Sequence, residues 1–217
     1  MKGITIGVYA GFVGETVRRD ARGKHIRDAH FEALKARLRN ITDAEVLEIY
    51  RRNYWVLVRG DELPRGIDLA VFDFCLNAGP SQAVRSLQRV LGVSSDGHLG
   101  PATMGAITRC DRAALIRVYM AERRRFYRAL STFPTFGKGW LRRADGVEAA
   151  AIEMAGHVTL ENVGPHRWRG VWASARTSRP IRPPRSALPA SSRCSSQRHS
   201  RRLRTVASAC RSTRSSA

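Results

Sequence analysis

Apolar and polar residues alternate with the spacing of an α-helix in much of the chain, first in residues 42–55, TDAEVLEIYRRNYW. Thr42 and Glu45 stand three positions apart, as in a capping box, where each side chain binds the other residue's backbone N–H. The residues expected to face the core follow at intervals of four: Val46, Tyr50 and Tyr54. The pattern predicts an amphipathic helix over this segment.

A second helix is predicted after Pro64, over RGIDLAVFDFCLNAG, residues 65–79. Its apolar residues form one stripe and then extend around most of the remaining surface, which is typical of a helix at the centre of a domain. Gly79 is expected to end this helix in the left-handed conformation. Ser81 is expected to cap the next helix, whose inward residues are Val84, Leu87 and Leu91.

A longer helical pattern begins after Asp111, whose side chain is expected to cap it. The inward positions of this helix are Leu115, Val118, Tyr119, Phe126 and Leu130. The ordered part of the chain therefore consists of helices, and the predicted fold class is all-α.

Residues 91–103, LGVSSDGHLGPAT, join two of these helices. Asp96 and Gly97 both tolerate positive φ and predict a tight turn. Gly100 and Pro101 predict the start of the next helix, because the fixed φ of proline suits a first helical position. On these residues alone the corner is structural, and any binding would come from the surface that it shapes.

The corner and the helix before it resemble the repeat of peptidoglycan-binding domains. That repeat has a Leu-Gln pair, a Leu-Gly-Val helix end, an Asp-Gly turn and a Gly-Pro-x-Thr segment. The matching positions are all in register: Leu87, Gln88, Leu91, Gly92, Val93, Asp96, Gly97, Gly100, Pro101 and Thr103. The resemblance implies that peptidoglycan is the partner of this region.

Four further segments are similar to the glycoside hydrolase family 108 lysozymes, which are phage endolysin-type muramidases with a C-terminal peptidoglycan-binding region. They follow in the family's order: Gly3–Tyr9, Glu48–Trp55, Asp68–Gly79 and Phe133–Arg143. The resemblance implies a lysozyme-like helical domain in residues 1–62 and a helical peptidoglycan-binding region in residues 63–150. It also implies cleavage of the glycan between N-acetylmuramic acid and N-acetylglucosamine.

One family feature is missing from the sequence. The family's acid catalyst is the Glu of a Glu-Gly-Gly-Tyr motif on a first helix, ahead of a Gly-Ile-Thr segment, and here residues 3–5 are already Gly-Ile-Thr. Glycoside hydrolysis needs a carboxylic acid that protonates the leaving oxygen. We therefore expect the catalytic Glu to lie before Met1 and the activity of residues 1–217 to be low or lost. The weak fallback candidates are Glu15, Asp20 and Asp73, and a missing helix predicts exposed apolar surface near Ile4, Ile6 and Val8.

The candidates for substrate binding are Tyr54, Trp55, Asp73, Asn77 and Trp140. Tyr54 and Trp55 follow two arginines, so their rings either stack on sugars beside wall carboxylates or serve as a core residue and a helix-end anchor. Asp73 and Asn77 share one helix face and either line a cleft or brace a neighbouring element. Trp140 belongs to TFGKGW, which is either a cleft wall or a plain loop with aromatic anchors.

The net charge of +20 favours an anionic partner, and it is unevenly distributed. Residues 157–217 contain thirteen arginines, no lysine and one acid, Glu161, which gives them a net charge of +12. They are rich in Arg, Ser and Pro and contain few large apolar residues, so they predict a disordered tail. This tail is interpreted either as an arm that binds polyanions non-specifically or as a non-native extension, such as translation through a shifted frame.

Cofactors and metals are not expected, because neither the six histidines nor the cysteines Cys75, Cys110, Cys194 and Cys210 have ligand spacing. No apolar run reaches transmembrane length, and the N-terminus shows no signal-peptide pattern. We therefore expect synthesis in the cytoplasm and action on the cell wall after holin-type release or another export route. Three classes remain: a peptidoglycan-binding muramidase, a non-catalytic wall-binding remnant, and a basic nucleic-acid-binding protein.

Overall fold

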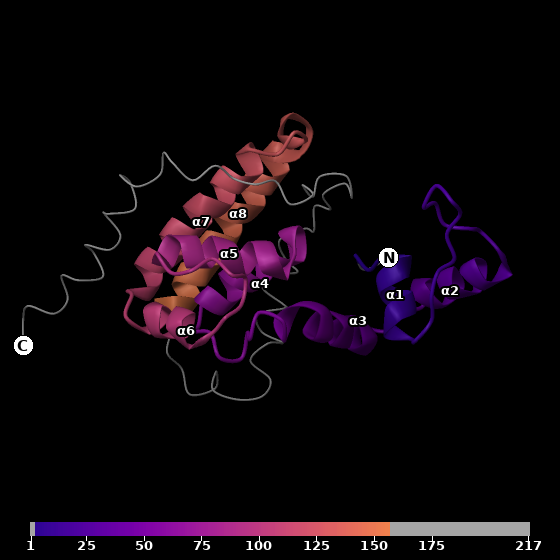
Figure 1. Cartoon of the computed structure of the whole chain (residues 1–217), viewed down its shortest axis with the longest axis horizontal. Helices are drawn as coiled ribbons and strands as arrows, with labels where there is room; N and C mark the ends of the chain where they lie inside the picture. Colours follow the sequence, from indigo (N-terminus) through magenta and orange to yellow (C-terminus); the bar gives the residue numbers. More distant parts are fainter. Residues whose placement is uncertain (1–2, 157–217) are drawn as a thin grey trace, which may run out of the picture. The chain divides into compact units, whose positions relative to one another are not determined.

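The computed structural model describes residues 3–156, and its regular elements there are helices, which confirms the all-α class for this part of the chain (Figure 1). Their order is α1 (Ile6–Phe12), α2 (Ala29–Arg39), α3 (Asp43–Tyr50), η1 (Arg51–Trp55), α4 (Ile67–Ala78), α5 (Pro80–Leu91), α6 (Pro101–Thr108), α7 (Arg112–Arg128) and α8 (Phe133–Gly156). The helices belong to two compact units that divide between Asn53 and Tyr54. The tail expected to be disordered, residues 157–217, lies outside the described residues.

Capped helices build the first unit, in which α1 packs against α2 and α3. The three helices begin at side chains that accept a backbone N–H: Thr5, Asp28 and Thr42. The Glu45 carboxylate accepts the Thr42 backbone N–H at 2.8 Å while Thr42 accepts that of Glu45, so the predicted capping box is confirmed. The buried apolar residues are Ile4, Tyr9, Ala10, Phe31, Leu34, Leu38, Ile41, Val46 and Ile49.

The expected apolar surface near the N-terminus is wrong for Ile4, which is 6% exposed, whereas Ile6 and Val8 are half-buried. The physical reason is that α1 packs into its own unit, so these residues do not depend on a further helix for cover. Among the described residues, the large apolar side chains that are exposed are instead Val56 and Leu57.

The segment predicted as a single helix over residues 42–55 changes character after Tyr50, because Arg51–Trp55 form a turn of π-helix. A π-turn holds an extra residue and therefore shifts the phase of the apolar stripe. The expected inward residue Tyr54 is half-buried, whereas Trp55, one position later, is completely buried.

The centre of the second unit is α4, as predicted from its apolar surface. Every residue from Ile67 to Cys75 is buried, and α4 packs against α5, α7 and α8. Around it, α5 packs against α6 and α7, and α7 lies alongside α8 (Figure 1). The side chains from Ile67 to Cys75 are therefore enclosed by neighbouring helices, which decides the surroundings of Asp73.

The ends of α4 differ from expectation. The helix begins at Ile67, after Gly66, whose φ of +86° and close approach to α8 exclude a side chain: a Cβ there would lie 2.3 Å from the Ala151 carbonyl oxygen. At the other end Gly79 has φ +89° and ψ 160°, so its positive φ is extended rather than left-handed helical. This conformation lets α5 start at once.

The predicted cap of α5 is also wrong. Gly79 is the N-cap, Pro80 is the first helical residue, and Ser81 lies inside the helix, where its Oγ accepts a hydrogen bond from Arg85 Nε at 3.1 Å. Proline suits the first helical position because its missing N–H has no partner there in any case. Val84 and Leu87 are buried as expected, but Leu91 is half-buried.

TFGKGW is not a loop, because it forms the first turns of α8. Glycines are poor helix formers, but Gly137 is required by packing: a Cβ there would lie 2.5 Å from the Phe133 ring. Asp111 caps α7 as predicted, accepting the Ala114 backbone N–H at 2.7 Å. Between residues 3 and 156, the structure contains no helix that is both long and apolar enough to cross a bilayer.

Candidate functional site

The corner of residues 91–103 is organised by one buried glutamine. Gln88 on α5 donates through Nε2 to Asp96 Oδ1 at 2.7 Å, to the His98 carbonyl oxygen at 2.9 Å and to Thr103 Oγ1 at 3.2 Å. Its Oε1 accepts the Gly97 backbone N–H at 2.9 Å. Gln88 and Thr103 are buried, whereas Asp96 and His98 are exposed, so Gln88 satisfies the buried Thr103 hydroxyl and joins it to the surface of the corner.

The turn itself needs one left-handed residue rather than two. Gly97 has φ +87°, whereas Asp96 acts through its carboxylate, which also accepts the His98 backbone N–H at 2.8 Å. Arg59 adds a further hydrogen bond to the Leu99 carbonyl oxygen. Gln88 of the peptidoglycan-binding pattern thus hydrogen-bonds to three other pattern residues, Asp96, Gly97 and Thr103, and these contacts stabilise the corner.

Replacing Gln88 with Leu is expected to lower the free energy of unfolding by about 1–3 kcal/mol, because Asp96, Gly97 and Thr103 lose a buried partner. Urea denaturation monitored by circular dichroism measures the change. The matched control is Gln82→Leu on the same helix, because half-buried Gln82 makes a single side-chain hydrogen bond within residues 3–156, to Ser86 Oγ at 3.0 Å. Equal losses for the two variants would show that the corner does not depend on Gln88.

Asp73 lies at the centre of a buried charged cluster between α4, α7 and α8. Its Oδ1 accepts from Arg123 Nη2 at 2.5 Å and from Arg143 Nε at 3.1 Å, and its Oδ2 accepts from Arg143 Nη2. Asp73 and Arg123 are fully buried. Asn77, one turn further along α4, donates through Nδ2 to the Asp73 backbone carbonyl at 2.7 Å.

Aromatic rings surround the cationic side of this cluster. The Arg123 guanidinium lies 5.2 Å from the Phe74 ring centroid and 5.3 Å from that of Tyr127, and its Nε donates to Tyr127 Oη at 2.8 Å. Burial disfavours the charged guanidinium, but Tyr127 and Asp73 outweigh it and raise the pKa of Arg123 above its ordinary value. Two guanidiniums thus bind the buried Asp73 carboxylate, which suits a structural role in joining α4, α7 and α8.

Glu15, a second fallback acid, is also engaged. Its carboxylate accepts from Arg37 Nη1 at 2.6 Å and lies 2.8 Å from His30 Nε2. The hydrogen bond from Arg37, followed by that from His30, lowers the pKa of Glu15. A general acid in glycoside hydrolysis needs the opposite shift.

Asp20, the third fallback acid, holds a turn. Its Oδ1 accepts the backbone N–H of Arg22 at 2.9 Å and that of Lys24 at 2.8 Å. Asp20 shares the first unit with Glu15, whereas Asp73 lies in the second. The structure therefore finds a local partner for each of the three carboxylates.

The aromatic candidates for substrate binding divide into exposed and buried. Trp55 is completely buried with its ring 5.4 Å from Phe72, and a Cβ at Gly60 would lie 2.3 Å from the indole. Trp140 is 3% exposed. Burial favours the packing interpretation for both tryptophans, and it also favours the bracing interpretation for Asp73. Tyr54 and Asn77 keep partly exposed side chains.

Trp140 belongs to an aromatic cluster. Its ring lies 5.4 Å from Tyr127 and is stacked on Phe136 at 5.7 Å. Phe74 and Phe126 extend this cluster, with their rings 5.5 Å apart. The cluster joins α4, α7 and α8 around the Asp73 ion pairs.

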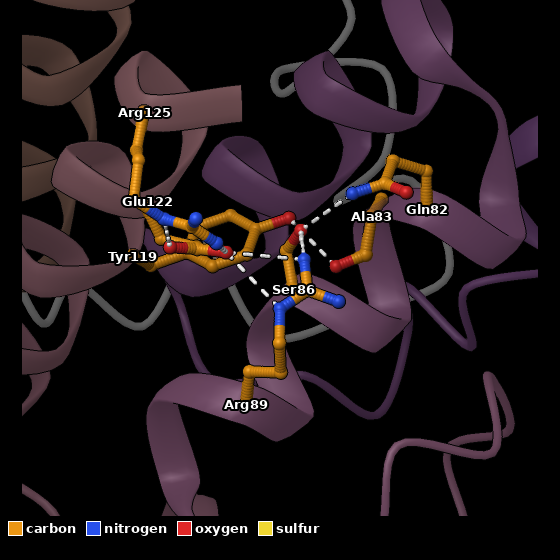
Figure 2. Close-up of polar contacts among 7 residues, drawn as sticks. All are labelled: Gln82, Ala83, Ser86, Arg89, Tyr119, Glu122 and Arg125. Carbon is orange, nitrogen blue, oxygen red and sulfur yellow. Dashed lines mark hydrogen bonds and ion pairs between the residues drawn. The ribbon is translucent and has the colours of Figure 1, made fainter. Parts of the chain in front are cut away.

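A polar contact between α5 and α7 was not predicted from the sequence. Figure 2 shows Glu122 between Arg89, whose Nε lies 3.1 Å from Oε1, and Arg125, whose Nε lies 2.6 Å from Oε2. Arg89 also donates to Ser86 Oγ at 2.8 Å, and Tyr119 Oη donates to the Ala83 carbonyl oxygen at 3.1 Å. The Arg89–Glu122 and Tyr119–Ala83 contacts join residues 33 and 36 positions apart, which helical periodicity does not reveal.

Burial raises and the two arginines lower the pKa of Glu122, and the net shift is downward, so the carboxylate is held ionised. The described residues contain no cluster of three or more His, Cys, Asp or Glu side chains suited to a metal ion. Burial raises the pKa of the Cys75 thiol, which makes it inert.

Comparisons with known proteins match two successive segments of the chain to two families. Residues 1–79 match the profile described as glycosyl hydrolase 108, and residues 82–145 match one described as a predicted peptidoglycan domain. The solved structure of SagA from Brucella abortus is similar, with 34% sequence identity and a TM-score of 0.62, over 73% of this chain and 82% of that one. No curated protein matches the sequence significantly.

Proposed function

The chain belongs to the glycosyl hydrolase 108 family, followed by a peptidoglycan domain, and from this we propose how it acts on the cell wall. It is a lysozyme-type glycoside hydrolase that binds peptidoglycan. In our proposal residues 63–150 hold the polymer, while residues 1–62 contribute to cleavage between N-acetylmuramic acid and N-acetylglucosamine. The observation that carries the proposal is the hydrolase match followed directly by the peptidoglycan match.

Within the sequence we propose that none of Glu15, Asp20 and Asp73 supplies the acid. Each already has a structural partner: Arg37 binds Glu15, backbone N–H groups bind Asp20, and Arg123 binds Asp73. In our proposal the acid role belongs to a Glu-Gly-Gly-Tyr motif of the family's kind, which residues 1–217 do not contain. Tyr54 and Asn77 are the proposed glycan contacts, because their side chains are partly exposed.

The cellular role that we propose is endolysin-like degradation of the wall after release from the cytoplasm. Non-specific polyanion binding by the arginine-rich residues 157–217 is a separate proposal, which rests on their composition. The same arginine-rich composition is the observation that favours the alternative of a basic nucleic-acid-binding protein.

The full chain is expected to sediment with purified peptidoglycan sacculi. It is expected to stay in the pellet at about 0.5 M salt, where interactions between exposed charges are largely screened. The protein that remains in the supernatant measures binding. Chitin is the control, because it offers a neutral glycan without peptides. Equal sedimentation with chitin and sacculi, or complete release by salt, would contradict specific peptidoglycan binding.

A further inference from the structure

The segment between α1 and α2 contains a compact group of positive charges, residues 18–27, RRDARGKHIR, which we call the basic turn. Five of its ten residues are Arg or Lys, and its one acid is Asp20. Figure 1 shows this segment as part of the long connection between the two helices. Its charge raises the question of what it binds.

The basic turn has a defined backbone. Arg19 and His25 form an antiparallel bridge, and Gly23 at φ +73° closes the turn, with its N–H bonded to the Asp20 carbonyl at 2.9 Å. The Asp20 carboxylate accepts two more backbone N–H groups, from Arg22 and Lys24. The one acid is therefore committed to the backbone, and it holds the turn in a fixed shape.

The base of the turn is attached to α2. Arg18 Nη1 lies 3.2 Å from Asp28 Oδ2, while Asp28 Oδ1 caps α2 by accepting the Phe31 N–H at 2.8 Å. The ring centroids of His25 and Phe31 are 5.8 Å apart, and Phe31 is buried. Contacts with the packed helix α2 therefore anchor the basic turn.

Three cationic side chains of the basic turn remain available to bind an anionic partner. Arg22, Lys24 and Arg27 are exposed, and no ion pair or side-chain hydrogen bond within residues 3–156 neutralises them. Keeping like charges near each other has an electrostatic cost, which an anionic partner would remove. A preorganised display of cations also binds with a smaller loss of side-chain and backbone freedom.

We propose that the basic turn is a second contact with the wall, which binds the carboxylates of the peptide stems while the glycan is held elsewhere. The inference rests on the proposed function, because peptidoglycan supplies carboxylates at regular spacing along its glycan. Arginine and lysine bind carboxylates through charge-assisted hydrogen bonds. The turn lies in the hydrolase segment, so it is separate from the matched peptidoglycan domain.

The test compares the affinities of full-length variants for purified sacculi. The triple variant Arg22→Gln, Lys24→Gln, Arg27→Gln is expected to bind about fivefold or more weakly, since three exposed charge contacts are lost. The matched control removes the same charge from α2, outside both the basic turn and the matched peptidoglycan domain, through Lys35→Gln, Arg37→Gln and Arg39→Gln, and is expected to change affinity less than about twofold. Equal weakening by both triples would overturn the proposal.

Substitutions of Asp20 distinguish binding that needs the shape of the basic turn from binding that needs only its net charge. Asp20→Ala adds a positive charge but removes the acceptor of two backbone N–H groups, so we expect weaker binding. Asp20→Asn adds the same charge and keeps an acceptor oxygen, so we expect binding to be retained. Tighter binding by Asp20→Ala would show that charge alone matters and would overturn the proposal.

Two further probes identify the anion. Sacculi whose carboxylates are amidated by carbodiimide treatment are expected to bind the wild type as weakly as untreated sacculi bind the turn variant. The affinities of the wild type and the turn variant for the amidated sacculi are expected to be equal. If the turn variant loses affinity for duplex DNA but not for sacculi, the partner is nucleic acid and the proposal is wrong. If the wild type binds no sacculi, the proposed function itself fails; if it binds and the turn variant binds equally, only the basic turn fails.

Discussion

Replacing Asp73 with Ala is expected to lower the free energy of unfolding by about 3–5 kcal/mol, because it leaves two buried guanidiniums without their anion. Arg123 and Arg143 both bind this carboxylate, and Arg123 has no exposure to water. The loss is a large fraction of the stability of a domain of this size. Thermal and urea unfolding of the full-length protein measure it.

The matched control is Asp145→Ala, which removes the same side chain from an exposed ion pair with Arg124. Its expected cost is about 0–1 kcal/mol, since solvent screens that pair and Arg124 keeps Glu148 as a partner. Similar losses at the two aspartates would show that the buried cluster contributes no more than a surface pair. Asp73→Asn is expected to fall between them, because it keeps an acceptor but removes the charge.

The second large effect concerns catalysis. Residues 1–217 alone are expected to release little or no glycan from peptidoglycan, and a helix carrying Glu-Gly-Gly-Tyr joined ahead of Gly3 is expected to restore hydrolysis. The expected difference is about 10²–10⁴ in rate, the usual contribution of general acid catalysis. Reducing sugars released from sacculi measure it.

Changing only the added Glu to Gln should abolish the gain and leave binding to sacculi intact, because the substitution removes the proton but preserves the shape. If residues 1–217 already hydrolyse peptidoglycan as fast as the fusion, the acid lies within the sequence. Glu15→Gln, Asp20→Asn and Asp73→Asn would then identify it, since a catalytic acid loses activity without a matching loss of binding.

Much of the second unit could be predicted from the sequence, because its signals are local. The all-round apolar surface of residues 67–78 indicated a central helix, and the cap at Asp111 was confirmed. The spacing of Gln88, Asp96 and Thr103 marked the corner correctly, although only the structure shows that one side chain joins them.

The errors arose where tertiary packing overrides local preference. The π-turn after Tyr50 moved Trp55, rather than Tyr54, into a buried position. The glycines at the start of α8 suggested a loop, but Gly137 lies within the helix, where the Phe133 ring occupies the space that a side chain would need. The ion pairs of Asp73 join residues 50 and 70 positions apart, and no periodicity along the chain indicates which arginine reaches which acid.

The Asp-Gly corner has a chemical consequence. In such sequences the glycine backbone nitrogen attacks the aspartate side-chain carboxyl carbon with loss of water, and hydrolysis of the resulting succinimide gives isoaspartate. Here the Gly97 N–H donates to Gln88, and the Asp96 carboxylate is fixed by His98 N–H and Gln88 Nε2. Those contacts, that of His98 foremost, also lower the pKa of Asp96, and an ionised carboxylate is a poor electrophile. The hydrogen bonds that shape the corner therefore oppose the spontaneous conversion of Asp96 to isoaspartate.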